Sequence, residues 1–189
     1  MKKFFLHSIL VLLIFISTGL SFAQNNIELT DIWTSNTFRP KSISDIRSMN
    51  NGEQYCVLKR NEIVLYDYKT GKEASKLLKA TQLNKAAGIG KIVINDYSFS
   101  PDESQILLAT ETERIYRHST RAEFYIWDIK NEKLTKLSEN GKQRLAEYSP
   151  DGTQIAFVRK NNFFIKDIGE NIEIQITNDG ENGKIINGT

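Results

Sequence analysis

Residues Tyr97–Asp128 read Y-S-F-S-P-D-E-S-Q-I-L-L-A-T-E-T-E-R-I-Y-R-H-S-T-R-A-E-F-Y-I-W-D, and they contain the most informative pattern of the chain. It opens with a turn signature, S-P-D at positions 100–102, because serine suits the first position of a type I turn and the fixed φ of proline suits the second. Short apolar strands are predicted over Gln105–Thr110 and Phe124–Ile129. The residues between them are polar and contain the tripeptide R-H-S.

The same frame occurs twice more, without the polar excursion. The first copy reads M-N-N-G-E-Q-Y-C-V-L from Met49 and the third reads S-P-D-G-T-Q-I-A-F-V from Ser149, with the glutamines in one register. A repeat of about 50 residues is typical of a β-propeller blade. Each copy also closes a strand with an aspartate, which we expect to accept backbone N–H groups in a turn. These residues are Asp67, Asp128 and Asp167.

The predicted fold class is therefore all-β: an incomplete β-propeller of about three four-stranded blades, after an N-terminal signal helix. The blades are placed near residues 44–78, 91–137 and 144–177. The connector Leu78–Gly90 is predicted to be a flexible link, and a convincing helix pattern appears only in the leader. Since propellers close with four to eight blades, we expect the chain to be a piece of a longer one, or to complete its ring with other chains.

The first 23 residues have the pattern of a secretory signal peptide. Two lysines at positions 2 and 3 precede the apolar run Ile9–Ile16, and S-F-A at 21–23 fits the small-x-small cleavage rule. The run is short for a membrane span, which needs about 20 apolar residues. Cleavage after Ala23 and a periplasmic or secreted product are predicted, with an uncleaved membrane anchor as the alternative. The resulting division is a signal peptide at 1–23, a lead-in segment at 24–43 and a partial propeller at 44–189.

Composition argues against several classes of function. Removing Lys2 and Lys3 with the leader takes the net charge from +2 to 0, so we expect no nucleic-acid partner. Cys56 is the only cysteine and lies in an apolar strand, where a small buried side chain is predicted. His118 is the only histidine after the leader, and no G-x-S-x-G elbow occurs. We therefore expect no metal site, no cofactor, no self-contained hydrolase site and no membrane contact beyond the export signal.

Arg117 and His118 are the candidate site residues. The turn residue and the closing aspartate are 26 positions apart in the middle copy, against 16 in the other two, so the middle copy has gained ten residues that include Arg117. On composition alone, a solvated hairpin with paired charges is the favoured interpretation, because glutamates and arginines interleave along it. The insertion itself favours a binding role instead, as do its aromatic flanks, Tyr116, Phe124 and Tyr125.

The string Y-R-H-S-T-R-A-E-F-Y-I-W-D, with Y-S-F-S-P-D before it, resembles the propeller domain of dipeptidyl peptidase IV, in the prolyl oligopeptidase family of serine peptidases. Phe38–Tyr55, F-R-P-K-S-I-S-D-I-R-S-M-N-N-G-E-Q-Y, is similar to the segment that opens this propeller in bacterial members. Ile174–Gly180 is similar to a family strand that precedes the next blade. The resemblance covers Ile27–Thr189, and R-H-S in an insertion at this blade position is its most specific element.

This resemblance implies an eight-bladed propeller that caps an α/β-hydrolase domain, with the active site in the cavity between them. Enzymes of the family release N-terminal dipeptides that have proline or alanine in second place. The arginine of their R-H-S motif helps to hold the substrate backbone. This substrate-binding role maps to Arg117, and His118 is the second candidate. The implied partners are peptide N-termini and, because the family often forms dimers, a second copy of the complete enzyme.

The sequence departs from the family by omission. The glutamate pair of D-W-V-Y-E-E, which grips the substrate amino group, is expected just after I-I-N-G-T, and the catalytic serine, aspartate and histidine are expected further on. No catalytic residue is therefore predicted in these 189 residues, and the chain alone is predicted to be inactive. Two functions remain open: the N-terminal propeller portion of an exported dipeptidyl peptidase IV-like serine exopeptidase, which contributes substrate gating and binding, and a non-catalytic periplasmic propeller that acts as a binding or scaffold module.

Overall fold

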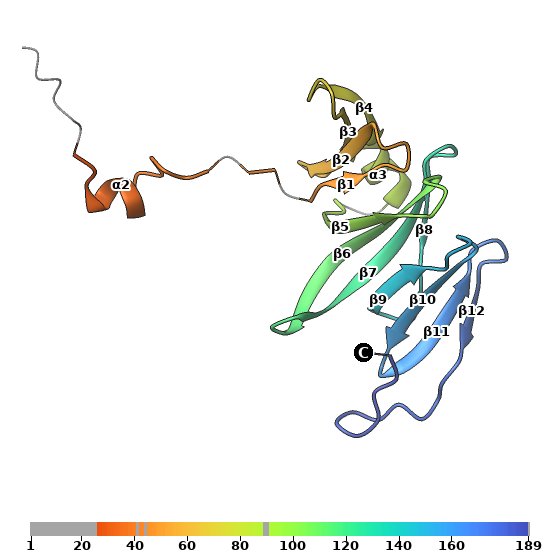
Figure 1. The fold of residues 1–189 in the computed structure, drawn as a ribbon. Coiled ribbons are helices and arrows are strands. Elements are labelled where there is room, and N and C mark those ends of the chain that lie inside the picture. Colours follow the sequence, from red (N-terminus) through yellow and green to blue (C-terminus); the bar gives the residue numbers. More distant parts are fainter. Residues whose placement is uncertain (1–25, 41, 44, 89–90, 189) are drawn as a thin grey trace, which may run out of the picture. The chain divides into compact units, whose positions relative to one another are not determined.

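The computed structural model describes residues 26–40, 42–43, 45–88 and 91–188 (Figure 1). The predicted signal helix and its cleavage site lie outside the described residues. The chain divides into two compact units, Met1–Ser42 and Ile43–Thr189. The described residues of the first unit include one short helix, α2 (Leu29–Trp33), whose N-terminus is capped by a hydrogen bond from the Glu28 backbone N–H to the Asp31 carboxylate, at 3.0 Å.

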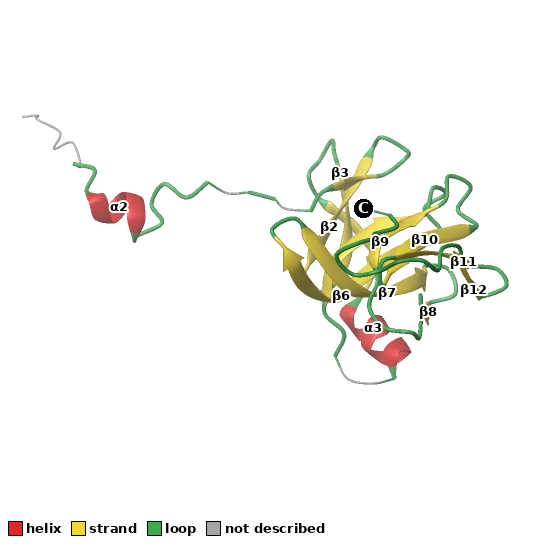
Figure 2. Ribbon diagram, turned by 90° about the horizontal axis from the view of Figure 1, so that it is seen from below, coloured by secondary structure: helices red, strands yellow, loops and turns green. Residues whose placement is uncertain are grey.

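The second unit consists of three antiparallel four-stranded sheets, each a simple meander in which consecutive strands pair (Figure 2). The prediction of an all-β incomplete propeller with three blades is confirmed. The first blade contains β1 (Arg47–Ser48), β2 (Gln54–Lys59), β3 (Glu62–Asp67) and β4 (Glu73–Leu78). The second contains β5 (Ile94–Phe99), β6 (Gln105–Tyr116), β7 (Ser119–Asp128) and β8 (Lys133–Lys136). The third contains β9 (Arg144–Tyr148), β10 (Gln154–Arg159), β11 (Asn162–Asp167) and β12 (Ile172–Gln175).

The repeated sequence frame produces the same local structure three times. In each blade the corner before the second strand is a turn closed by a backbone hydrogen bond, from Gly52 to Met49, from Glu103 to Ser100 and from Gly152 to Ser149. In each blade the closing aspartate also accepts a backbone N–H three residues later, at 2.7, 2.8 and 2.9 Å for Asp67, Asp128 and Asp167. The predicted structural role of these aspartates is therefore confirmed.

Two apolar clusters hold neighbouring blades together. The cluster between the first and second blades contains Cys56, Leu78 and Trp127 among its buried members. Cys56 is fully buried, so the prediction of a small buried side chain is confirmed. Burial raises the pKa of its thiol to about 12. The cluster between the second and third blades is built around Phe157 and Phe164, whose rings stack with centroids 5.5 Å apart. Because each blade buries a face only against its neighbours, stability depends on blade-to-blade packing.

A helix in the connector was missed by the sequence analysis. α3 (Ala80–Ala87) ends at Gly88, whose φ of +65° provides a left-handed C-cap. Its one buried residue, Leu83, is fully enclosed by the cluster between the first and second blades. The prediction of a flexible link was therefore wrong for this segment. A single buried leucine gives no 3.6-residue apolar repeat, so the helix depends on tertiary contact that the local sequence does not reveal.

Candidate functional site

The second and third strands of the middle blade run on as a two-stranded ribbon beyond their neighbours (Figure 1). β6 has 12 residues and β7 has 10, whereas β5 has 6 and β8 has 4. The predicted end of the first strand at Thr110 was therefore too early, and the predicted start of the second strand at Phe124 was too late. The two strands remain paired in the outer part of the ribbon, where Glu113 lies opposite Arg121 and Arg114 lies opposite Thr120. Polar side chains are compatible with this pairing because both faces of the ribbon are solvated.

The ribbon begins at Glu111, and the equivalent position in each of the other two blades forms a tight turn. Six residues after the repeated glutamine, Arg60 and Lys160 have φ of +52° and +48°, and each is followed by an asparagine that also has positive φ. Such a pair is typical of a type I′ hairpin turn. Glu111 has the same register and a φ of +47°, but no second positive φ follows it. The pairing register shifts between Thr110 and Glu113 instead, so this residue forms a bulge and the strands continue.

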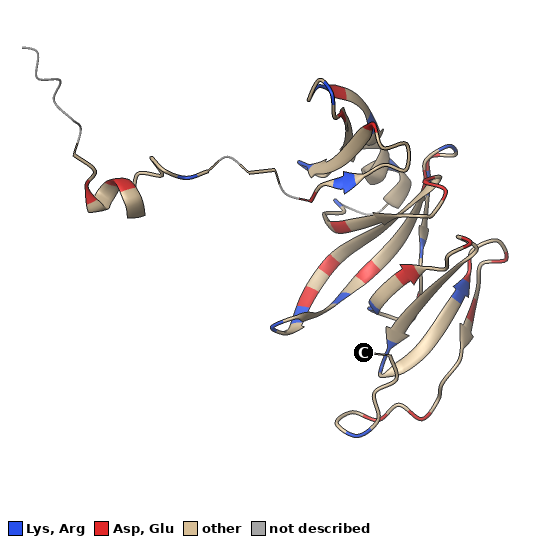
Figure 3. Ribbon diagram, viewed as in Figure 1, with Lys and Arg blue, Asp and Glu red and all other residues tan. Residues whose placement is uncertain are grey.

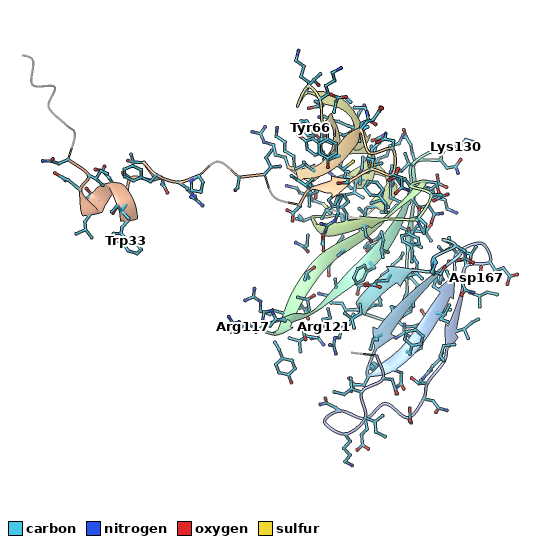
Figure 4. The ribbon with its side chains drawn as sticks, viewed as in Figure 1. Trp33, Tyr66, Arg117, Arg121, Lys130 and Asp167 are labelled. Carbon is cyan, nitrogen blue, oxygen red and sulfur yellow. The ribbon has the colours of Figure 1, made fainter. Side chains whose placement is uncertain are left out.

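Arg117 and His118 are the two residues at the tip of the ribbon. Tyr116 pairs with Ser119, so only these two residues make the turn. Both side chains are exposed, and among the described residues neither makes a hydrogen bond or an ion pair through its side chain. Figure 4 shows the labelled Arg117 at the far end of the ribbon, with Arg121 closer to the sheet. The structure thus places the two predicted residues side by side at the tip of the ribbon.

The base of the ribbon is fixed by an ion-pair network that includes Lys142. The Glu113 carboxylate accepts from Arg121 Nε at 2.7 Å and from Lys142 Nζ at 2.7 Å. The Lys142 ammonium also donates to the Glu111 carbonyl oxygen at 2.6 Å. The hydrogen bond from Lys142, and then that from Arg121, hold the pKa of Glu113 below its usual value. The ion pairing expected of a solvated hairpin is therefore found for Arg121 but, within the described chain, not for Arg117.

A second link joins the ribbon to the third blade through the backbone. Ala122 and Gln143 exchange two N–H to O hydrogen bonds, each 2.9 Å long, and the Gln143 side chain is fully buried. Sequence reasoning missed both Lys142 and Gln143, because neither belongs to a motif and their partners lie about 20 to 30 positions earlier in the chain. Only the pairing of strands from different blades brings them to the ribbon.

A groove of about 460 Å³ lies between the ribbon and the third blade. Its walls come from four parts of the chain: the outer half of the ribbon, the loop before β9 with the first residue of that strand, the end of β10 with the β10–β11 turn, and the tail at 182–186. The groove reaches Tyr116, which is next to Arg117 in the chain and 76% exposed. The tip of the ribbon and the groove are therefore parts of one continuous surface.

The described residues include neither a cluster that could hold a metal ion nor a helix that could span a membrane. No group of three or more histidine, cysteine, aspartate or glutamate side chains there is arranged to hold a metal ion. Likewise, none of the helices that the structure describes combines the length and the apolar character needed to cross a membrane.

The sequence of this chain is similar to a known family model and to curated relatives. Residues 100–189 match the family model described as dipeptidyl peptidase IV (DPP IV) N-terminal region. Prolyl endopeptidase FAP of Homo sapiens is 30% identical over 163 residues, which are 85% of this chain and 20% of the relative. Dipeptidyl peptidase 4 of Felis catus is 32% identical over 167 residues, which are 88% of this chain and 21% of the relative. The chain therefore spans about a fifth of the length of these curated relatives.

A solved structure agrees in both fold and sequence. The crystal structure of Porphyromonas gingivalis dipeptidyl peptidase 4 superimposes with a TM-score of 0.71 at 38% identity, over 84% of this chain and 22% of that one. At this identity the likeness extends beyond fold alone, and the family match begins at Ser100, the first residue of the turn that leads into the ribbon strand β6. The chain therefore belongs with the dipeptidyl peptidase IV-like proteins and corresponds to the N-terminal β-propeller part of one.

Proposed function

We propose that this chain is the substrate-gating and substrate-binding propeller portion of an exported serine exopeptidase, which releases Xaa-Pro and Xaa-Ala dipeptides from peptide N-termini. The observation that carries the proposal is Arg117, an exposed arginine at the tip of a projecting ribbon with no partner among the described residues. In the family that the chain resembles, the arginine of R-H-S helps to hold the substrate backbone. The names of the relatives, dipeptidyl peptidase 4 and prolyl endopeptidase, support the reaction class.

The chemistry of the side chain suits this role. A guanidinium remains charged at any physiological pH and presents a planar fork of N–H donors. Two adjacent donors can therefore bind one substrate carbonyl oxygen, or two neighbouring ones, through charge-assisted hydrogen bonds. The tip is also rigidly supported, because Lys142 and Gln143 tie the base of the ribbon to the third blade. A positioned cation at the end of a braced strand pair is a suitable device for orienting a peptide.

In this proposal the bond-breaking groups lie outside the 189 residues, because this sequence contains no G-x-S-x-G nucleophile elbow. His118 is proposed as a secondary contact beside Arg117. The proposed location is the periplasm or the extracellular space, reached through cleavage after Ala23, and the proposed partners of the complete enzyme are peptide N-termini and a second copy of itself. Export is tested by N-terminal sequencing of secreted material, which should begin at Gln24; a leader that remains attached in the membrane fraction would contradict it.

The activity is tested with the polypeptide made from the complete coding sequence and with the 189-residue chain. We expect the complete polypeptide to release p-nitroaniline from Ala-Pro-p-nitroanilide and to ignore the N-acetylated substrate, because an exopeptidase of this kind needs a free amino group. The 189-residue chain should release none. Failure of the complete polypeptide to turn over the free substrate would overturn the proposal and would favour a non-catalytic propeller, and turnover by the short chain would overturn the assignment of the chemistry to other residues.

A further inference from the structure

The third blade contains a nearly buried ion pair between Arg159 of β10 and Glu173 of β12. Arg159 Nη2 lies 2.5 Å from Glu173 Oε1, and the two side chains are only 10% and 16% exposed. The guanidinium also lies 4.1 Å from the centre of the Phe164 ring, which belongs to the apolar cluster between the second and third blades. Burial raises the pKa of the Glu173 carboxyl, but hydrogen bonds from Arg159 and other polar neighbours outweigh it and leave the pKa below its usual value. Both groups are therefore charged at neutral pH.

This ion pair holds one end of the loop between β8 and β9, residues 138–143, which we call the support loop. Arg159 Nη1 donates to Ser138 Oγ at 2.6 Å. Asn140 Nδ2 donates to Glu173 Oε1 at 3.3 Å, and the Asn140 backbone N–H donates to Ser138 Oγ at 3.3 Å. Each member of the pair therefore bonds to a different residue of the loop.

The other end of the support loop carries the ribbon. Lys142 makes the ion pair with the ribbon carboxylate described above. Gln143 is fully buried, and its Oε1 accepts the backbone N–H of Phe124 on β7 at 3.3 Å, while its Nε2 donates to the Gly141 carbonyl oxygen. Figure 3 shows charged positions both on the ribbon strands and on the strands of the third blade, which this loop connects. A continuous series of contacts thus runs from the ion pair to the base of the ribbon.

The pair is better suited to fixing a geometry than to adding stability. A buried ion pair contributes little net stability compared with apolar side chains of similar volume, because the cost of removing both charges from water offsets their attraction. Its hydrogen bonds are directional, however, and they hold the groups around them in one arrangement. Coupling between distant groups is carried by such contiguous contacts, and it is demonstrated by a measured coupling energy.

We propose that the Arg159–Glu173 pair is a positioning element for the reaction: through the support loop it holds the ribbon so that the Arg117 guanidinium meets the substrate backbone. The proposal rests on the proposed function, in which Arg117 makes that contact. Neither member of the pair touches the substrate in this scheme. Position matters because a misplacement of about 1 Å can reduce a rate by up to about 100-fold.

A double-mutant cycle in the complete enzyme tests this role with Ala-Pro-p-nitroanilide. Glu173→Gln keeps the shape of the side chain and removes its charge. We expect kcat/KM to fall by about fivefold or more when Arg117 is present, but by less than about twofold in an Arg117→Ala background, because the contact that the pair positions is then already lost. A general loss of structure would lower kcat/KM equally in both backgrounds. Equal falls, or no fall in either background, would overturn the proposal.

Three further variants make the assignment specific. Asn140→Ala, at an exposed position, keeps the ion pair and removes only its bond to the loop, so it decides the question if Glu173→Gln does not fold. It should lower kcat/KM by about twofold or more, again only when Arg117 is present. Glu173→Asp keeps the carboxylate and should recover part of the loss seen in Glu173→Gln. The matched control is Glu62→Gln in the first blade, where the carboxylate lies 2.6 Å from Lys76 Nζ and is 24% exposed; kcat/KM should stay within about twofold.

A structural measurement separates this proposal from the proposed function. Hydrogen exchange of the complete polypeptide, followed by mass spectrometry, is compared for peptides from residues 113–123 of the ribbon and 54–67 of the first blade. Glu173→Gln and Asn140→Ala should accelerate exchange in the ribbon by roughly threefold or more and leave the first blade unchanged, since the ribbon opens locally. If the complete polypeptide does not hydrolyse Ala-Pro-p-nitroanilide, the proposed function fails while this measurement still decides whether the pair holds the ribbon. Ribbon exchange that is unchanged in Asn140→Ala, or equally accelerated in Glu62→Gln, would overturn the positioning role.

Discussion

Lys142 and Glu113 connect two blades: the ammonium of the lysine, in the loop before β9, lies 2.7 Å from a carboxylate oxygen on β6. This contact is the main side-chain brace of the ribbon, because the Lys142 side chain is only 20% exposed whereas the Arg121 side chain is 56% exposed. The orientation of the tip therefore depends on a residue that is distant in sequence and belongs to the next blade.

Replacement of this lysine should loosen the ribbon. In Lys142→Met the apolar stem is kept and the ion pair is lost, so the ribbon should open locally more often. Limited digestion with trypsin should then cut after Arg114 and Arg117 roughly threefold or more faster than in the unsubstituted chain, because proteolysis follows the population of open forms. Lys72→Met, at an exposed position without an ion pair in the described chain, should leave the rate unchanged. Equal rates in both variants would show that Lys142 does not brace the ribbon.

Acid should loosen the ribbon in the same way. The hydrogen bonds from Lys142 and Arg121 lower the pKa of Glu113, so the stabilisation is fully present above the usual glutamate pKa and is lost as the pH falls through the lowered value. Amide exchange at Ala122 and Gln143, corrected for its intrinsic pH dependence, should therefore accelerate below about pH 4. Glu113→Gln should show fast exchange already at pH 7 and little further change, whereas Glu147→Gln, at an exposed position, should keep the original profile. An unchanged acid profile in Glu113→Gln would rule out this carboxylate as the cause.

The helix α3 should contribute to the stability of the first two blades. Leu83→Ala removes a fully buried side chain, which typically costs about 2–5 kcal/mol in the free energy of unfolding. Lys85→Ala, at an exposed position of the same helix, should change it by less than about 0.5 kcal/mol. Urea denaturation followed by circular dichroism gives both values. A Leu83→Ala variant as stable as Lys85→Ala would mean that the helix does not belong to the core.

The repeated elements of the fold were predictable because their signals are local. The corner turns, the closing aspartates and the second strand of the first and third blades follow from residues that lie within a few positions of one another, such as Ser149 with Gly152 and Asp167 with Glu170. The helix α3 was not predictable, since it is held by one leucine that meets the core only after the blades pack.

Only part of the candidate site could be predicted from the sequence. The ten-residue insertion and the sequence R-H-S marked the tip, and the structure places Arg117 and His118 there. Two features were not accessible from sequence. The outer parts of the ribbon strands lack the alternation of apolar and polar residues that is typical of a strand. The bulge at Glu111 depends on a positive φ, although the residue there is neither a glycine nor an asparagine. Lys142, Gln143 and Arg144 adjoin the ribbon only through contacts between blades.

The proposed substrate contact depends on Arg117. A control substitution must therefore remove a nearby charge without disturbing the ion pairs of Glu113 that support the ribbon. Arg121 holds Glu113, so its replacement would disturb the ribbon as well as the local charge. Arg114 is exposed and makes no ion pair within the described chain. Arg114→Ala therefore removes an identical charge three residues away from the proposed contact, without removing a known support of the tip.

The most direct measurement is kcat/KM of the complete enzyme for Ala-Pro-p-nitroanilide in Arg117→Ala, Arg117→Lys and Arg114→Ala. A charge-assisted hydrogen bond contributes about 1.5–3 kcal/mol, and each tenfold change in kcat/KM corresponds to about 1.4 kcal/mol. We expect a loss of roughly tenfold or more in Arg117→Ala and incomplete recovery in Arg117→Lys, because an ammonium cannot reproduce the guanidinium fork. Arg114→Ala should change kcat/KM by less than about twofold. Equal and small effects in Arg117→Ala and Arg114→Ala, with circular dichroism spectra unchanged, would contradict this expectation and would show that Arg117 is one more surface charge.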